Sequence, residues 1–346
     1  MTPPVSGLEV RLRRYPEGLP VADDFECVRA AVPPVGPGQL LVRTRWLSID
    51  PAMRTWSSRS PGRGDPMPLG SVMKAMGVGE IVESRHPDYA VGERVVGYLG
   101  LREWHVTDGR DLRRRVSPRV DPLQRSLGIL GHIGLTAYAG VHRVLAVEPG
   151  QTVLVSSAAG AVGSIAGQLA RIHGCRVIGI AAGAQKVQLC LTDYRFDACL
   201  DRLEVDDLDA ALAEAAPEGI HCYFDNTGGV ILDAAMRALQ PLGRVAVCGT
   251  ISISSSNPGD GPRHERRILD RRLTVRGFLQ SDFEHESESM LQDLMRWHDS
   301  GEVVMAEDIT RGLANSPTAV VRQLSGQHLG KVLVGIDTDE SSHQFE

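Results

Sequence analysis

A glycine-rich turn between a predicted strand and a predicted helix constrains the fold of this chain more than any other feature. Residues 153–155 form a short β-branched run, and apolar residues between 162 and 172 recur at helical spacing. Between them lie Ala158, Gly160 and Gly163, in the spacing of the motif G-x-G-x-x-G with alanine in the first position. After a strand and before a helix, this motif predicts a site for the pyrophosphate of a dinucleotide.

Each small residue of this turn has an expected task. We expect Ala158 to make the tight turn, Gly160 to let the backbone approach the pyrophosphate, and Gly163 to let the helix pack on the strand. The pyrophosphate would then lie at the positive end of a helix that begins near Ala161. The alternative is that the glycines form a packed turn without a ligand.

The next predicted strand, residues 176–180, indicates which dinucleotide would bind. NAD-binding units usually carry an acidic residue at its end, which holds the ribose 2′-hydroxyl. Here the chain reads Ala181-Ala-Gly-Ala-Gln-Lys186, with no acidic residue and with one of the chain's three lysines. Small side chains leave room for a 2′-phosphate and Lys186 offers it a charge, so NADP is favoured over NAD. The alternative is that Lys186 is an ordinary surface lysine.

The pattern of apolar residues, prolines and glycines changes along the chain, which predicts two domains. Residues 1–128 contain short apolar stretches separated by proline and glycine, as in a small barrel or sandwich. Further on, strand-like runs alternate with helical patterns, which predicts parallel βαβ units. The expected fold class is α/β, with a β-rich domain of residues 1–128, completed by about 310–346, and a doubly wound parallel sheet in residues 129–309. The tail, residues 310–336, reads as short strand-like pieces that rejoin the first domain.

The composition argues against several kinds of partner. The net charge of −6 gives no electrostatic reason to expect a nucleic acid or an anionic membrane. No apolar run reaches the roughly 18 residues of a membrane span, and the N-terminus lacks the apolar core of a signal peptide. The six cysteines include no C-x-x-C pair, so we expect free thiols, a reducing compartment, namely the cytoplasm, and no structural zinc.

Two familiar catalytic arrangements are missing from the sequence. None of the six tyrosines is followed four residues later by lysine, so the Tyr-x-x-x-Lys pair of short-chain dehydrogenases is absent. Gly131 and His132 are followed by Ile133 rather than by the glutamate of zinc alcohol dehydrogenases. The histidines show no metal-ligand spacing either, and no catalytic metal is therefore expected.

Together the motifs resemble those of the medium-chain dehydrogenase/reductase family. The resemblance is strongest to its zinc-free branch of leukotriene B4 dehydrogenases, prostaglandin reductases and alkenal double-bond reductases, and it runs from about residue 39 to 336. The segments that carry it are Leu47-Ser-Ile-Asp-Pro-Ala-Met-Arg54, Gly134-Leu-Thr-Ala-Tyr138, residues 158–168, Tyr223-Phe-Asp-Asn-Thr-Gly-Gly229, Gly243-Arg-Val-Ala-Val-Cys-Gly249 and Leu329-Gly-Lys331.

The resemblance implies a fold, a cofactor and a reaction. Enzymes of this branch pair a GroES-like barrel with a Rossmann domain, usually dimerise through the latter, and bind NADPH. They move hydride from NADPH to the β-carbon of an α,β-unsaturated ketone or aldehyde, and hydrogen bonds stabilise the resulting enolate. The residues that the resemblance places at the cofactor are Gly160, Ala161, Val162, Gly163 and Ser164 at the pyrophosphate, Lys186 at the 2′-phosphate, and Asn226, Cys248, Gly249, Thr250, Ile251, Ser252, Phe278, Leu279 and Gln280 around the ribose and nicotinamide.

This chain departs from the family's pattern at four positions. Ser254 stands where relatives have a tyrosine that is thought to position the substrate carbonyl, so Ser254 is the candidate catalytic residue. Ala52 stands where many relatives have another tyrosine. Arg202 replaces a tyrosine that approaches the 2′-phosphate, a change that can strengthen NADP binding. His328 replaces the asparagine expected before Leu-Gly-Lys, and it can still contact the cofactor through a hydrogen bond.

Several basic residues have more than one interpretation. The basic runs 110–115 and 263–276 are expected to be solvated faces or salt-bridge partners, because the chain is negative overall. The resemblance places the second run near the cofactor cleft, where one arginine could meet a phosphate. Lys331 is either a contact to the cofactor or a structural lysine.

The sequence therefore predicts an NADPH-dependent, metal-free reductase of activated carbon–carbon double bonds, acting on a small molecule as a cytoplasmic homodimer. Neither a nucleic acid nor a membrane is expected as a partner. Two alternatives remain open. One is an NADPH:quinone reductase on the same scaffold, and the other is a catalytically weak NADPH-binding protein in which the lost tyrosines mark a disabled site.

Overall fold

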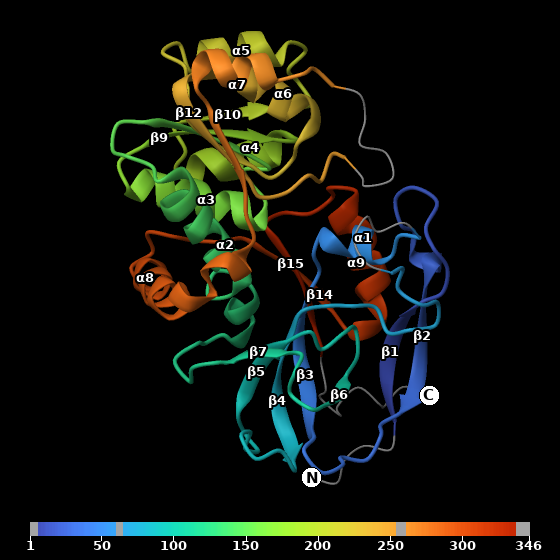
Figure 1. Cartoon of the computed structure of the whole chain (residues 1–346). Coiled ribbons are helices and arrows are strands. Elements are labelled where there is room, and N and C mark those ends of the chain that lie inside the picture. Colours follow the sequence, from blue (N-terminus) through green and yellow to red (C-terminus); the bar gives the residue numbers. More distant parts are fainter. Residues whose placement is uncertain (1–5, 60–64, 254–260, 337–346) are drawn as a thin grey trace. The chain divides into compact units, whose positions relative to one another are not determined.

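The structure, a computed structural model, describes residues 6–59, 65–253 and 261–336 (Figure 1). The chain divides into two compact units, residues 1–127 with 307–346 and residues 128–306. Each unit has its own main sheet and its own buried apolar core.

The first unit is built on a mixed sheet with the strand order β14-β15-β3-β4-β5-β7, and β6 also pairs with β3. Strand β3 pairs with β4, β6 and β15, and six of its nine residues are buried. Strands β1 and β2 form a separate antiparallel pair. The strands are β1 (Ser6–Leu12), β2 (Phe25–Ala31), β3 (Leu40–Ser48), β4 (Gly77–Ser84), β5 (Arg94–Gly97), β6 (Trp104–Thr107), β7 (Leu112–Arg115), β14 (Glu307–Arg311) and β15 (Lys331–Gly335).

The C-terminal part of the chain completes this first sheet. Strand β15 pairs antiparallel with β3 and parallel with β14. The short strand-like pieces expected in this tail are present, but a helix that the sequence analysis did not predict, α9 (Ser316–Leu324), connects them. Its apolar residues pack into the core of the first unit, and Pro317 lies in its first turn, where a missing backbone N–H costs no hydrogen bond. The short helices of this unit are α1 (Ala52–Trp56), η1 (Ala22–Asp24), η2 (Leu123–Leu127) and η5 (Leu313–Asn315).

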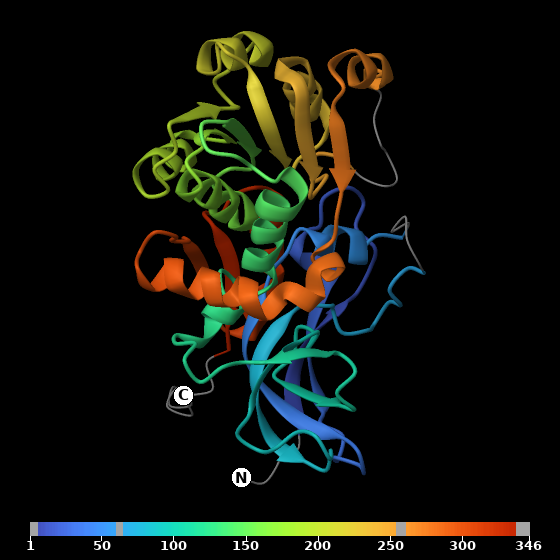
Figure 2. The same ribbon diagram turned by 60° about the vertical axis from the view of Figure 1, so that its left-hand side comes forward.

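The second unit contains a six-stranded sheet in which every neighbouring pair is parallel. Helices cover both faces: α5, α6 and α7 lie on one side, and α2 and α3 on the other (Figures 1 and 2). Central strands buried on both sides explain the continuous apolar runs of the sequence. The strands are β8 (Thr152–Ser156), β9 (Arg176–Ala181), β10 (Ala198–Asp201), β11 (Ile220–Asp225), β12 (Leu239–Val247) and β13 (Thr274–Gly277).

The order of these strands determines where a ligand can bind. The order is β10-β9-β8-β11-β12-β13, so the chain winds outward in one direction from β8 and in the other from β11. In sheets of this kind the ligand crevice lies at the carboxyl ends of the two strands where the direction reverses. The remaining helices are α2 (His132–Ala139), η3 (Gly140–Leu145), α3 (Ala161–Ile172), α4 (Ala184–Thr192), α5 (Leu208–Ala215), α6 (Gly229–Ala238), α7 (Glu265–Arg271), η4 (Gln280–Glu286) and α8 (Ser287–Asp299).

The predicted fold class, a β-rich part joined to a doubly wound parallel sheet, is confirmed. Among the described residues, no helix combines the length and the apolar character needed to cross a membrane.

Candidate functional site

The turn that follows β8 has a different geometry from the one expected. The left-handed residue is Ser157, with φ at 49°, and not Ala158. Ala158 is fully buried, and its backbone N–H donates to the carbonyl of Ile180 on the neighbouring strand at 3.0 Å. Alanine is therefore suited to position 158 because this residue packs against β9, while Ser157 reverses the chain.

The two glycines of the turn are required by space rather than by an unusual φ. A Cβ atom on Gly163 would lie 2.3 Å from the carbonyl oxygen of Ser157, a contact that only movement of the backbone could relieve. On Gly160 it would lie 2.9 Å from the Ser157 Oγ atom. Gly163 thus lets helix α3 pack directly against the turn, as the motif predicted.

The N-terminus of α3 is open to a ligand. Gly160 is its N-cap residue and has no side chain to accept the first N–H groups of the helix. The first intrahelical bond of this turn runs from Ser164 N to Gly160 O at 2.9 Å, so the N–H groups of Ala161, Val162 and Gly163 precede it. Free N–H groups at a helix N-terminus form an anion site. Ser164 itself is buried, and its hydroxyl donates to the carbonyl of Ala161 at 3.2 Å.

A second group of positive charges lies at the ends of β9 and β10. Two hydrogen bonds join the strand ends. The carboxylate of Asp201 accepts from Gly183 N at 2.8 Å, and Arg202 N donates to Ala181 O at 2.8 Å. Lys186 is half-buried here, and burial together with the charge of Arg202 lowers its pKa. Two cations that repel each other at this position would both be stabilised by a phosphate.

Asn226 ties the two central strands together at the point where the winding reverses. Its backbone N–H donates to Ser156 Oγ at 2.9 Å, and its side-chain Nδ2 donates to Ser156 O at 2.8 Å. Only about a tenth of Asn226 is exposed. The residue therefore fixes the carboxyl ends of β8 and β11 relative to each other, directly beside the turn at Ser157.

The sequence analysis did not single out Asp225, which organises the loop into α6. The residue is fully buried, and its Oδ1 atom accepts from Thr227 N and Gly228 N, both at 2.9 Å, and from the hydroxyl of Tyr223 at 2.7 Å. Burial and this carboxylate raise the pKa of Tyr223 well above its usual value. The run Asp225-Asn-Thr-Gly-Gly229 is a turn signal that could have identified it.

The loop after β12 is fixed to this Asp225 turn. The N–H groups of Cys248 and Gly249 donate to Asp225 O at 2.8 and 3.1 Å, and Ser252 donates to Thr227 O through its N–H at 3.0 Å and its hydroxyl at 2.7 Å. Thr250 and Ile251 between them are exposed. Burial and the charge of Asp225 raise the pKa of the Cys248 thiol to about 12, so this thiol stays protonated at neutral pH.

The remaining predicted site residues differ in their surroundings. Phe278 is buried, with its ring edge-on to Phe224 at a centroid distance of 6.3 Å, whereas Leu279 is more than half exposed. Gln280 donates to the hydroxyl of Ser287 at 3.3 Å. His328 belongs to the first unit. Ser254, the candidate catalytic residue, lies outside the described residues.

Lys331 is a structural lysine. It is 2% exposed, and its Nζ atom donates to the carbonyls of Ile49 and Val332 at 2.9 and 3.1 Å and to Asp50 Oδ1 at 2.9 Å. These three bonds use all three donors of the ammonium group.

Within the described parts of the chain, no group of three or more His, Cys, Asp or Glu residues could hold a metal ion, so the donor set does not fit zinc.

Comparison with known protein families matches both halves of the chain to domains of oxidoreductases. Residues 9–114 match the family described as the N-terminal domain of oxidoreductase, and residues 161–297 match the family described as zinc-binding dehydrogenase. The chain is 35% identical to the NADPH-dependent curcumin reductase of Escherichia coli K12, covering 95% of this chain and 96% of that one. It is 35% identical to pig prostaglandin reductase 1, covering 93% and 97%.

Two further relatives agree with these. The tobacco NADP(+)-dependent 2-alkenal reductase is 34% identical, with 98% of this chain and all of the relative covered. Among solved structures, CurA from Vibrio vulnificus in complex with NADPH superimposes with a TM-score of 0.89 at 32% identity, covering 96% of this chain and all of the other.

Proposed function

This chain belongs to the medium-chain dehydrogenase/reductase family, in the branch of the curcumin, prostaglandin and 2-alkenal reductases, and from this premise we propose that it reduces the carbon–carbon double bond of α,β-unsaturated ketones or aldehydes. The observation that carries the proposal is the similarity over nearly the whole chain to a relative named as a 2-alkenal reductase. The arrangement of the second unit supports it, because the residues at the carboxyl edge of its sheet fit a dinucleotide.

NADPH is the cofactor of this enzyme, and the described residues fit it at two points. The uncapped N-terminus of α3, with Gly160 and Gly163 beneath it, suits the pyrophosphate. Lys186 and Arg202 suit the 2′-phosphate. When bound, NADPH supplies the hydride. We propose that Asn226 and residues 248–252 lie along the ribose and nicotinamide, flanked by residues 278–280 and by His328.

The reaction requires a hydrogen-bond donor near the substrate oxygen. Addition of hydride to the β-carbon moves an electron pair onto the carbonyl oxygen, and a donor aimed at that oxygen lowers the barrier. We assign this donor to the hydroxyl of Ser254. The thiol of Cys248 adds no negative charge near this oxygen, because its pKa of about 12 keeps it neutral.

We also propose that the enzyme is a cytoplasmic homodimer. All six cysteines are free thiols, which is typical of a reducing compartment. The dimer is expected to form through the second unit, whose edge strand β13 is exposed at all four residues.

Oxidation of NADPH, followed by its absorbance, tests the proposed reaction with a 2-alkenal, an enone and a quinone as acceptors and with NADH in place of NADPH as control. Turnover of the alkenal or the enone supports the proposal. Turnover of the quinone alone would assign the chain to the quinone reductases. Binding of NADPH without turnover of any acceptor would indicate a disabled site.

Replacement of Ser254 by alanine tests the proposed donor. Loss of one oxyanion donor typically lowers kcat on the order of 100-fold, while the KM for NADPH should remain unchanged. Ser254→Thr, which keeps a hydroxyl, is the matched control and should retain most of the activity. An unchanged kcat in Ser254→Ala would exclude the role.

A further inference from the structure

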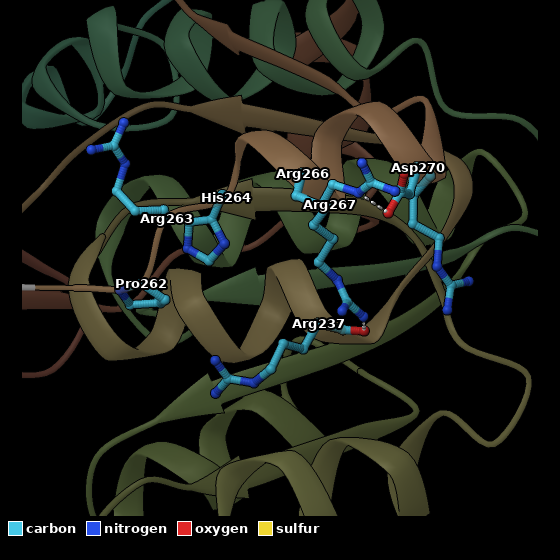
Figure 3. A pocket seen from close by; sticks show the side chains of 8 residues that line it. Arg237, Pro262, Arg263, His264, Arg266, Arg267 and Asp270 are labelled. Carbon is cyan, nitrogen blue, oxygen red and sulfur yellow. Dashed lines mark hydrogen bonds and ion pairs between the residues drawn. The ribbon is translucent and has the colours of Figure 1, made fainter.

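A pocket lined by arginines lies beside helices α6 and α7 in the second unit (Figure 3). Its volume is about 340 Å³. The residues that line it come from the last turn of α6, from the segment before α7 and from α7 itself, and they are Arg237, Pro262, Arg263, His264, Arg266, Arg267, Asp270 and Arg271. Five of these eight residues are arginines and one is acidic, so the lining carries an excess of positive charge.

Three of the five arginines are paired with carboxylates. Arg237 binds Asp209 through two bonds of 2.7 and 2.8 Å, Arg266 Nε donates to Asp270 at 2.9 Å, and Arg263 Nε donates to Glu265 at 2.9 Å. Arg263 and Arg266 are largely exposed, so these two pairs are screened by solvent and easily exchanged for another anion.

The other two arginines form no ion pair with a carboxylate among the described residues. Arg267 Nε donates to the carbonyl of Met236 at 2.6 Å, and its Nη2 donates to the carbonyl of Arg237 (Figure 3), both near the C-terminal end of α6. Arg271 pairs with no carboxylate among the described residues. Burial lowers the pKa of Arg267, and the charges of Arg271 and Arg237 lower it further.

This pocket is separate from the cofactor edge of the sheet. Helix α6 begins at Gly229, beside the Asp225 turn, and Arg237 lies in its last turn, near the opposite end of a helix of ten residues. Arg271 is the last residue of α7 and lies three positions before Thr274, the first residue of β13, so it is near the amino end of that strand. Arg237 and Arg271 thus lie away from the carboxyl edge of the sheet, and a contact between another arginine of the run 263–276 and a cofactor phosphate stays a prediction.

We infer that this pocket binds a chain of phosphate groups, as found in an inorganic polyphosphate or in a nucleoside triphosphate. Guanidinium groups bind phosphate oxygens through paired, charge-assisted hydrogen bonds, which suits a lining of several arginines. A chain of phosphates presents several oxygens and several charges at once, so it can contact Arg271, Arg266 and Arg263 together. A single carboxylate cannot span them.

Calorimetric titration of the full-length protein with inorganic tripolyphosphate tests this site. The protein is saturated with NADPH, so that Lys186 and Arg202 are occupied, and the ionic strength is held constant, because exposed charges are screened by salt. We expect saturable binding that Arg271→Gln weakens about tenfold, the usual effect of losing one charge-assisted contact. Asp270→Asn removes a competing carboxylate and should tighten binding a few-fold.

Arg110→Gln is the matched control, because Arg110 is an equally exposed arginine of the first unit and is paired with Asp108. It should leave the affinity unchanged, and thermal unfolding without ligand should be the same for all variants. Parallel titrations with ATP and with adenosine distinguish the sources: equal affinity for ATP and tripolyphosphate supports an inorganic chain, and tighter binding of ATP supports a nucleotide. Absence of binding in the presence of NADPH, or binding that Arg271→Gln does not weaken, would overturn the inference.

Discussion

Lys186 and Lys331 show how burial gives the same side chain two different tasks. Lys331 is enclosed in the core of the first unit with all three donors bonded, one of them to Asp50. Lys186 is half-buried near the end of β9, and burial together with the charge of Arg202 lowers its pKa. The first arrangement needs no ligand, whereas a phosphate beside Lys186 and Arg202 would reduce the repulsion between these two cations.

Replacing Lys186 should therefore change the choice of cofactor. In Lys186→Ala we expect the KM for NADPH to rise about 10- to 100-fold, since a hydrogen bond to a charged group contributes about 1.5–3 kcal/mol. The KM for NADH, which lacks the 2′-phosphate, should stay the same, and Lys186→Arg should largely restore the preference. Steady-state kinetics with both cofactors measure this. Equal changes with NADPH and NADH would contradict the assignment.

Replacing Lys331 should affect stability instead of cofactor choice. Lys331→Met leaves the carboxylate of Asp50 buried without its counter-charge, which typically costs about 3–5 kcal/mol. Calorimetry should show the melting temperature of the first unit lowered on the order of 10 °C. The double variant Asp50→Asn/Lys331→Met removes both charges and should recover part of the loss. A single variant as stable as the wild type would show that the pair contributes little.

At the scale of elements, the turn between β8 and α3 joins the sheet to the proposed cofactor site. Ser157 reverses the chain, Ala158 packs on β9, and Gly163 brings the helix against the turn. Because α3 begins only five residues after the end of β8, its first N–H groups lie near the carboxyl edge of the sheet, where we propose that the pyrophosphate binds.

A methyl group at position 163 should displace the helix. We expect Gly163→Ala to destabilise the second unit by about 1–3 kcal/mol, as overpacking does, and to weaken NADPH binding more than tenfold. The added Cβ would lie 2.3 Å from a backbone oxygen. Gly261→Ala is the control, because the nearest atom to its Cβ lies 3.7 Å away. Fluorescence titration with NADPH measures the affinity, and normal binding by Gly163→Ala would contradict this role of the turn.

The elements of the second unit were largely predictable from the sequence, and their exact contacts were not. Buried parallel strands are continuous apolar runs, so β8 and β9 were expected within one residue of their observed ends. The shift of the left-handed residue from Ala158 to Ser157 was not predictable, because both residues are small and the sequence pattern does not encode φ. Helix α9 was missed because only nine residues, bounded by turns, form it, and the core of the first unit stabilises it.

The cofactor residues were recognisable where a residue type is tied to a backbone requirement, as at Gly160 and Gly163. Asp225 was missed as an organiser because its role depends on Thr227 and Gly228 turning back towards its carboxylate, which only the folded loop shows. The two interpretations of Lys331 could be separated only by its burial and its partner Asp50, which lies 281 residues away in the chain.

At the scale of the whole molecule, the exposed edge strand β13 of the second sheet is the surface through which we propose that two copies of the chain associate. All four residues of β13 are exposed, and Val275 is 42% exposed. An unprotected edge strand of this kind readily pairs with another strand. The same edge on a second copy offers an identical partner, which a twofold axis would bring together.

A lysine on this edge should oppose the pairing. We expect the wild type to elute as a dimer, and Val275→Lys to shift it towards the monomer, because an edge lysine is a natural means of blocking strand addition. Leu242→Lys, at another exposed apolar residue of the same unit, is the control and should remain dimeric. Light scattering after size-exclusion chromatography gives the mass. A wild-type monomer, or a dimer unaffected by Val275→Lys, would contradict the proposed interface.

The scarcity of lysine means that amine-specific reagents can modify only three side chains of this protein. Of its 37 basic residues only Lys74, Lys186 and Lys331 carry a side-chain amine, and the three occupy different environments. Lys74 is exposed and open to acylating reagents in every state of the protein. Lys186, with its lowered pKa, is a more reactive nucleophile that a bound 2′-phosphate would shield. Lys331 becomes accessible only when the first unit opens. Amine acylation read by mass spectrometry therefore reports cofactor occupancy and unfolding at separate positions, with an internal reference in the same chain.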